Sequence, residues 1–153
     1  MSHYTDLIGA FKDGWDQWVL YDRDCDNFRY AFVEKFAAYL ETDPSNVIMI
    51  SEKMVYEQSF CIFEFRLHII TEFECAPQMV LTYTVYFKRA DQVWIVKVHD
   101  GPEEYRVSAD LSVGLDEVFA AILENAKKVS RNHLDYRIGA ARTKTVIGFV
   151  KTK

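Results

Sequence analysis

Apolar and polar side chains alternate along the middle of this chain, and this alternation constrains the fold more than any other feature. Odd positions from Cys61 to Phe73 are mostly aromatic or aliphatic, and the period of two returns in 78–88 and 93–99. Such a period is typical of β-strands that bury one face. A shorter run around Tyr105 follows, and 145–150 resembles an edge strand in composition. The pattern predicts an antiparallel meander of four or five strands.

The lengths of the predicted turns set a register for these strands. A three-residue turn at 75–77 pairs Phe65 with Phe87, and a four-residue turn at 89–92 pairs Phe87 with Trp94. Both pairings keep the apolar residues on one face of the sheet. The register therefore favours a sheet that is covered on that face only.

Three stretches, 4–20, 26–42 and 114–129, repeat apolar residues at helical spacing. The acidic segment 22–26 is predicted to be a loop between the first two helices, and Asp26 is predicted to cap the second. The apolar positions of the first stretch are Tyr4, Leu7, Ile8, Phe11, Trp15, Trp18 and Val19.

These elements predict an α+β fold in two layers. About three amphipathic helices cover one face of an antiparallel β-meander of four to five strands. The predicted core between these layers is Phe32, Phe36, Phe63, Phe65, Leu67, Val85, Phe87, Trp94, Val96, Phe119 and Ile122. The chain has 153 residues and no linker or low-complexity tract, so we expect a single domain over 1–153 that includes the segment 127–153.

Charge is divided unevenly along the chain. Residues 127–153 contain eight Lys/Arg against Asp135 alone, a net charge of +7, and because the whole chain carries −5 the rest carries −12. The basic C-terminal segment is predicted to contact the acidic surface of its own or a second chain, a protein partner, or nucleic acid. A homo-oligomer is favoured over nucleic acid, because stacking aromatics are few in this segment.

The cysteines and the apolar runs bear on location. Three cysteines cannot all pair with one another, and residues 1–5 do not resemble a signal peptide. No apolar run reaches the roughly 18 residues of a membrane span. We therefore expect a cytoplasmic protein that does not enter a membrane.

No motif predicts a catalytic residue, a cofactor or a metal. Asp22, Asp24 and Asp26 match the first ligands of a calcium loop, but Asn27 and Val33 replace the glycine and the bidentate glutamate that such a loop needs. The candidate partner surface is instead the outer sheet face together with the basic segment. Its residues are Arg66, His68, Thr84, Tyr86, Ile95, Lys97, His99, Arg131, Arg137, Arg142 and Lys144.

The outer face also carries apolar residues, among them Phe60, Ile62 and Val93. Either the C-terminal segment covers them or they form an interaction patch. The sequence thus predicts a non-enzymatic protein-interaction module, such as a small cytosolic inhibitor, adaptor or chaperone, including one of phage or mobile-element type, that acts on a larger complex. The alternatives are a ligand-binding domain or enzyme with a pocket near His68, His99, Tyr83 or Tyr86, and a nucleic-acid-binding protein.

Overall fold

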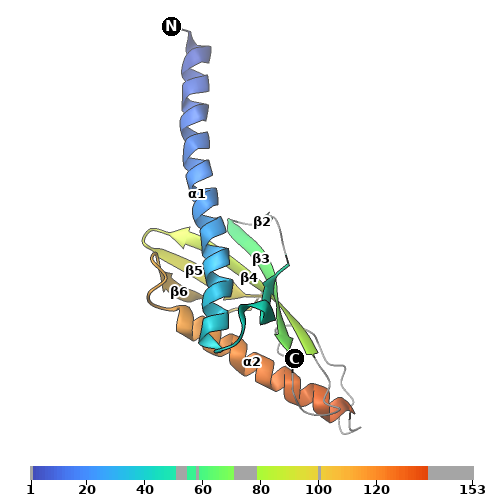
Figure 1. Ribbon diagram of the computed structural model, residues 1–153. Helices are drawn as coiled ribbons and strands as arrows, with labels where there is room; N and C mark the ends of the chain where they lie inside the picture. The colour runs from blue at the N-terminus through green and yellow to red at the C-terminus, as the bar shows by residue number, and fades with distance from the viewer. Residues whose placement is uncertain (1, 51–54, 58, 71–78, 100, 138–153) are drawn as a thin grey trace.

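An antiparallel sheet and two helices on one of its faces make up the fold (Figure 1). The computed structural model describes residues 2–50, 55–57, 59–70, 79–99 and 101–137. In chain order the elements are α1 (His3–Tyr39), the 3₁₀ helix η1 (Pro44–Asn46), β1 (Val47–Met49), β2 (Val55–Glu57), β3 (Phe60–Ile69), β4 (Met79–Ala90), β5 (Val93–Val98), β6 (Tyr105–Ser108) and α2 (Leu115–Arg137). The α+β class is confirmed. Over the described residues there are six strands and two α-helices, not the predicted four to five strands and three helices.

The strands lie in the order β1-β3-β4-β5-β6, and β2 pairs with β3 as well. Every pairing is antiparallel. The central strands β3 to β6 follow one another in sequence, so the predicted meander is confirmed. The short strands β1 and β2 extend it beside β3.

The predicted register is wrong at both central hairpins. Phe65 pairs with Tyr83, not with Phe87, because β3 ends at Ile69 opposite Met79 and a nine-residue connection replaces the three-residue turn. Each displacement is an even number of residues. The predicted apolar face was therefore right although the partners were not.

At the second hairpin Phe87 pairs with Val96, because Ala90 pairs with Val93 and leaves a two-residue turn. Asp91 has a φ of 56° in this turn. A left-handed residue at this position matches the twist of the flanking strands, which favours the two-residue turn over the predicted loop of four.

One uninterrupted helix replaces the first two predicted helices. The segment 22–26 is helical, and Asp26 does not cap a second helix but accepts a hydrogen bond of 2.7 Å from Nε of Arg29. The segment contains no glycine or proline, and its residue Cys25 is fully buried against Cys61 of the sheet. Burial of Cys25 and the absence of a helix breaker keep the helix continuous.

The C-terminal half of α1 and the helix α2 bury their apolar sides against the sheet. Phe32 is the centre of this core. The centroid of its ring lies 5.5 Å from that of Phe63 on β3 and 5.1 Å from that of Phe119 on α2, and both contacts are edge to face. The eleven residues that the sequence predicts for the core are all buried, and they are Phe32, Phe36, Phe63, Phe65, Leu67, Val85, Phe87, Trp94, Val96, Phe119 and Ile122. This core fixes the direction of α1.

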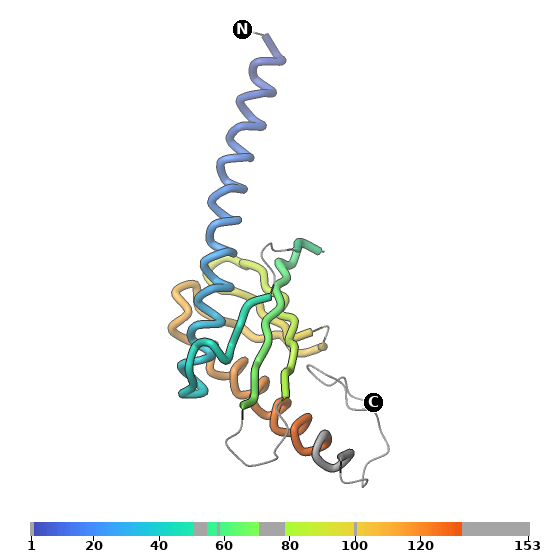
Figure 2. Tube along the Cα trace, turned by 45° about the vertical axis from the view of Figure 1, so that its right-hand side comes forward, coloured from blue at the N-terminus to red at the C-terminus, as the bar shows by residue number. Residues whose placement is uncertain are grey.

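The N-terminal half of α1 extends beyond the sheet. At about 1.5 Å per residue, a helix of 37 residues is roughly 55 Å long, and contacts with the sheet begin only at Trp18, which meets Tyr56 of β2. Figure 2 shows the first half of the helix leaving the two-layer body alone. The prediction that residues 4–20 pack on the sheet is wrong, because the continuous helix carries them past its edge.

Candidate protein-interaction surface

The projecting half of α1 carries an apolar stripe that the described part of the chain leaves exposed. We define the apolar stripe as Tyr4, Leu7, Ile8, Phe11, Trp15, Trp18 and Val19. Every residue from 2 to 20 is exposed, and Phe11 and Trp15 are 69% and 55% accessible. Isolated exposed apolar residues are common on proteins, but a contiguous aromatic patch marks an interaction site.

Local contacts support the projecting helix only weakly. The Ser2 hydroxyl caps it by accepting a 3.1 Å hydrogen bond from the backbone N–H of Thr5. An exposed ion pair joins Lys12 and Asp16 at 3.7 Å. A helix of this length is marginal in water by itself, so its continuity with the buried half must supply much of its stability.

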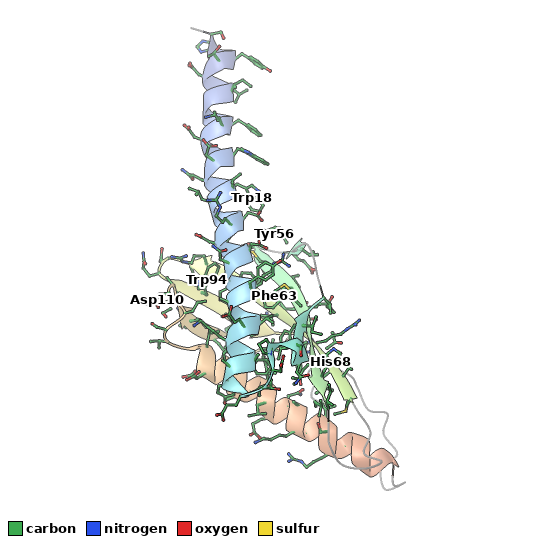
Figure 3. The ribbon with its side chains drawn as sticks, in the orientation of Figure 1. Trp18, Tyr56, Phe63, His68, Trp94 and Asp110 are labelled. Carbon is green, nitrogen blue, oxygen red and sulfur yellow. The ribbon has the colours of Figure 1, made fainter. Side chains whose placement is uncertain are left out.

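Aromatic contacts clamp the helix where it leaves the sheet. The ring of Trp18 lies 4.9 Å from Tyr56 of β2, and Tyr21 stacks on Trp94 of β5 at 6.5 Å. Figure 3 shows Trp18 and Tyr56 together at this junction. The Tyr56 hydroxyl donates a short hydrogen bond to Asp22. Burial and this bond both raise the pKa of Tyr56 above its usual value, so the donor stays protonated at neutral pH.

Two buried thiols lie just inside the junction. The Sγ atoms of Cys25 on α1 and Cys61 on β3 are 3.0 Å apart, and both residues are fully buried. The hydrogen bond to Cys61, together with burial, raises the pKa of the Cys25 thiol. A buried protonated thiol is a poor nucleophile, which agrees with a structural role for Cys25.

The outer sheet face holds most of the other candidate residues. Lys88 and Lys97 place their ammonium groups 4.6 Å and 5.3 Å from the centre of the Phe60 ring, and Tyr86 meets the same ring edge to face. Ile95 is buried on this face. The result is one cationic and aromatic cluster on β3, β4 and β5.

The register separates other residues that the sequence placed together. Arg66 pairs with Thr82 and not with Tyr86, and Lys97 pairs with Tyr86 and not with Thr84. Thr84 instead pairs with Glu64, whose carboxylate lies 3.5 Å from its hydroxyl.

The two histidines also lie apart. His68 pairs with Val80 near the end of β3, whereas the backbone N–H of His99 donates to the carbonyl of Thr84. His99 has a φ of 54°, and its ring lies 5.9 Å from that of Tyr83, a residue of the buried face. The left-handed backbone at His99 breaks the alternation from which its outward position was predicted.

Tyr83 lies in the core and links the sheet to α2. It is fully buried, it stacks on Phe65 at 5.5 Å, and its hydroxyl donates a 3.0 Å hydrogen bond to Oδ1 of Asn125 on α2. Burial raises the pKa of its phenol above the usual value of 10.0. The hydroxyl thereby ties α2 to the sheet as a neutral donor.

We expect this tyrosine to make the fold sensitive to alkali. Because the pKa of Tyr83 is raised in the folded chain, its contribution is fully present below the unfolded pKa of about 10 and is lost as pH rises further. Melting temperatures measured from about pH 8 to about pH 11 should fall less steeply for Tyr83→Phe than for the parent. Equal slopes would contradict this assignment.

A groove lies between the end of β3 and α2. Leu67, Ile69 and Leu123 are among its apolar lining residues, and three basic side chains, His68, Lys127 and Arg131, also border it. Its volume is about 480 Å³. The structure thus places His68 and Arg131, two of the predicted site residues, beside one hollow. Arg137 ends α2, and Arg142 and Lys144 lie outside the described residues together with the predicted strand 145–150.

Two properties of the described residues bear on the class of site. They contain no group of three or more His, Cys, Asp or Glu side chains arranged to hold a metal ion. Within the same residues, neither helix has the length and apolar character to cross a membrane.

Comparisons with protein-family models, with curated proteins and with solved structures gave no match to this chain.

The sequence marked the apolar stripe as one side of a helix but assigned it to the core. The signal that would have corrected this is the unbroken helical spacing from Trp18 through Tyr21 and Cys25 to Phe28. A single helix that long outreaches the sheet on which its second half packs.

Proposed function

We propose that this chain is a non-enzymatic protein-interaction module whose main binding surface is the apolar stripe of α1. The observation that carries the proposal is the exposure of this stripe on a helix that projects from a filled core. Small inhibitors, adaptors and chaperones that act on larger complexes work through such surfaces. The chain is proposed to belong to this functional group.

The composition of the stripe supports a protein as the bound partner. Four of its seven residues are Tyr, Phe or Trp, and aromatic side chains contribute much of the binding energy at protein interfaces. A helix that presents side chains at spacings of three and four residues fits an apolar groove or a second helix.

The charges around the stripe favour a protein over a lipid surface. Helices that lie on membranes usually carry Lys and Arg on their polar side. Here the polar side of residues 3–20 carries Asp6, Asp13 and Asp16 against Lys12 alone. Anionic lipid would repel this helix, whereas a protein groove imposes no such requirement.

The outer sheet face and the basic C-terminal segment are proposed as a second contact region. Lys88 and Lys97 add positive charge next to Phe60 and Tyr86 on that face. A partner that covers this cluster would have an acidic or aromatic surface.

Site-specific photo-cross-linking tests the main surface. A photoreactive phenylalanine analogue at position 11 should give a discrete protein adduct in extract of the source cell, and the same analogue at Ala10 should not. Both positions lie on the same exposed turn of α1, and only Phe11 belongs to the apolar stripe. An identical pattern of adducts from both positions would reject the apolar stripe as the binding surface.

A small anionic ligand with an apolar part is the second candidate. The groove between β3 and α2 supports it, since His68, Lys127 and Arg131 border an apolar floor. A panel of carboxylates and phosphates should then raise the melting temperature, and Arg131→Ala should abolish the rise. No shift with any compound of the panel would remove this candidate.

A further inference from the structure

We propose that the apolar stripe of α1 binds the same stripe on a second copy of this chain, with the two helices antiparallel. This inference rests on the proposed function, because it names the partner of the surface described there. It is supported by the spacing of the stripe, the position of the charges, and the way in which the sheet blocks one of the two orientations.

The spacing of the stripe is that of a two-helix seam. Tyr4, Ile8, Phe11, Trp15 and Trp18 follow one another at intervals of four, three, four and three residues. This repeat averages 3.5 residues, the period at which two helices keep one side in mutual contact. We call these five residues the seam.

The residues beside the seam do not oppose self-pairing. One flank is Leu7, Gly14 and Tyr21, and the other is Thr5, Lys12 and Val19. Lys12 is the one charge among these six residues, and it already pairs with Asp16. Asp6, Asp13 and Asp16 fall on the outer side of the helix in this repeat. Two copies can therefore meet without bringing like carboxylates together.

The sheet excludes a parallel pair. The side of α1 that bears the seam is continued by the side that packs on the sheet, as the contacts of Trp18 with Tyr56 and of Tyr21 with Trp94 show. A parallel partner helix would have to continue through the space that β2 and β5 occupy (Figure 3). An antiparallel partner reaches only to this junction, and the two sheets then lie at opposite ends of the helix pair.

One antiparallel register opposes four of the five seam residues to one another, including both tryptophans. It places Phe11 against the partner's Trp15 and Ile8 against the partner's Trp18. Tyr4 then lies opposite the partner's Asp22, a carboxylate at the next seam position. Sliding the helices by one heptad leaves Trp18 without an opposing seam residue. The first register therefore buries both tryptophans of the seam between the two helices.

The area of the stripe suffices for a weak but specific dimer. A fully covered aromatic side chain buries about 150–250 Å². The stripe presents four of these at 40–70% exposure together with Leu7 and Ile8. Pairing therefore buries on the order of 1,000 Å² over both chains, near the lower limit for a specific interface. We expect a dissociation constant of about 1–10 µM.

Sedimentation equilibrium of the purified full chain tests the pairing. From about 1 µM to about 100 µM the parent should pass from monomer to dimer. Phe11→Asp should weaken association by at least about tenfold, and Trp15→Asp should do the same. The matched control Ala10→Asp adds the same charge outside the seam and should dimerise like the parent. Circular dichroism before each run shows whether a variant has kept its fold.

Cross-linking with a short bismaleimide tests the orientation. In a Cys75→Ser background, Gly14→Cys should give a covalent dimer, because this residue lies near the twofold axis of the antiparallel pair and its position has room for a side chain. Tyr4→Cys should not, because the two copies of residue 4 lie far apart unless the helices are parallel. A covalent dimer from Tyr4→Cys and none from Gly14→Cys would overturn the antiparallel arrangement.

The outcomes separate this inference from the proposed function. A parent that remains monomeric, or a dimer that Phe11→Asp leaves intact, overturns self-pairing. If the photoreactive group at position 11 still captures a different protein, the interaction surface stands with another occupant. An adduct of twice the 17.9 kDa chain mass supports both. Binding of the monomeric chain to neutral phosphatidylcholine vesicles, abolished by Phe11→Asp, would assign the stripe to a membrane surface instead.

Discussion

Replacing Phe32 with alanine should lower the free energy of unfolding by about 3–5 kcal/mol. Phe32 is fully buried, and its ring contacts Phe63 and Phe65 on β3 and Phe119 on α2. Its removal leaves a cavity where both layers and both helices meet. Urea denaturation followed by circular dichroism measures the effect.

Phe11→Ala is the matched control, since it makes the same substitution on the same helix. Phe11 is 69% exposed and has no core contact, so the free energy of unfolding should change by no more than about 0.5 kcal/mol. The measurement belongs at about 0.1 µM, well below the dissociation constant expected for the proposed dimer. Similar losses for both variants would contradict the division of α1 into a buried and a projecting half.

Gly114→Ala should also be severely destabilising, by about 3–5 kcal/mol. Gly114 has a φ of +102°, and a Cβ atom there would lie 2.1 Å from the carbonyl oxygen of Arg106 and 3.0 Å from Cα of Val107. Both neighbours are backbone atoms of β6, so no side chain can rotate to relieve the contact. The loop would have to move and displace Leu115, which is buried in the first turn of α2.

Gly9→Ala provides the opposite case. Gly9 lies inside α1, and a Cβ atom there meets nothing within 4 Å. Alanine favours the helix by up to about 1 kcal/mol, so stability should stay the same or rise. Thermal and urea denaturation measure the stability of both glycine variants. A Gly114→Ala chain as stable as the parent would show that the β6–α2 loop has another conformation.

The sequence was sufficient for the central strands β3 to β6 and for their buried face, but it did not predict the short strands β1 and β2. Alternation in β3 and β4 assigned Phe63, Phe65, Val85 and Phe87 to the core, where they lie. Register was not determined by this pattern, because sliding a pair of strands by two residues keeps every side chain on its face. The left-handed residue Asp91 decided the turn, and the sequence alone did not indicate it.

Hydrophobic periodicity alone could not predict whether the first half of α1 packs on the sheet. Phe11 and Phe32 occupy equivalent positions on one long amphipathic helix, yet the first is exposed and the second is buried. Periodicity shows which side of a helix is apolar but not which surface covers it. That answer depended on whether 22–26 bends, and the contact of Cys25 with Cys61 belongs to the fold as a whole.

The candidate sheet-face residues show the same limit. Lys97 and Tyr86 were expected on one face, and the register makes them neighbours. His99 was expected on that face too. It has a positive φ, and its ring lies beside that of Tyr83, a residue of the buried face. Where strands end, local backbone conformation replaces alternation as the factor that directs a side chain.

The unbroken course of α1 also makes the protein a spacer of fixed length. The helix α1 contains no proline, and its two glycines, Gly9 and Gly14, lie inside helical turns without interrupting it. Whatever holds the tip is therefore kept at a set distance and a set angle from the sheet. Inserting seven residues before Trp15 would lengthen this arm by about 10 Å and rotate the tip by about 20°. Inserting four residues would lengthen it by about 6 Å and rotate the tip by about 40° in the opposite direction. The geometry of any assembly built on this helix is thus encoded in the number of residues between its tip and its first contact with the sheet.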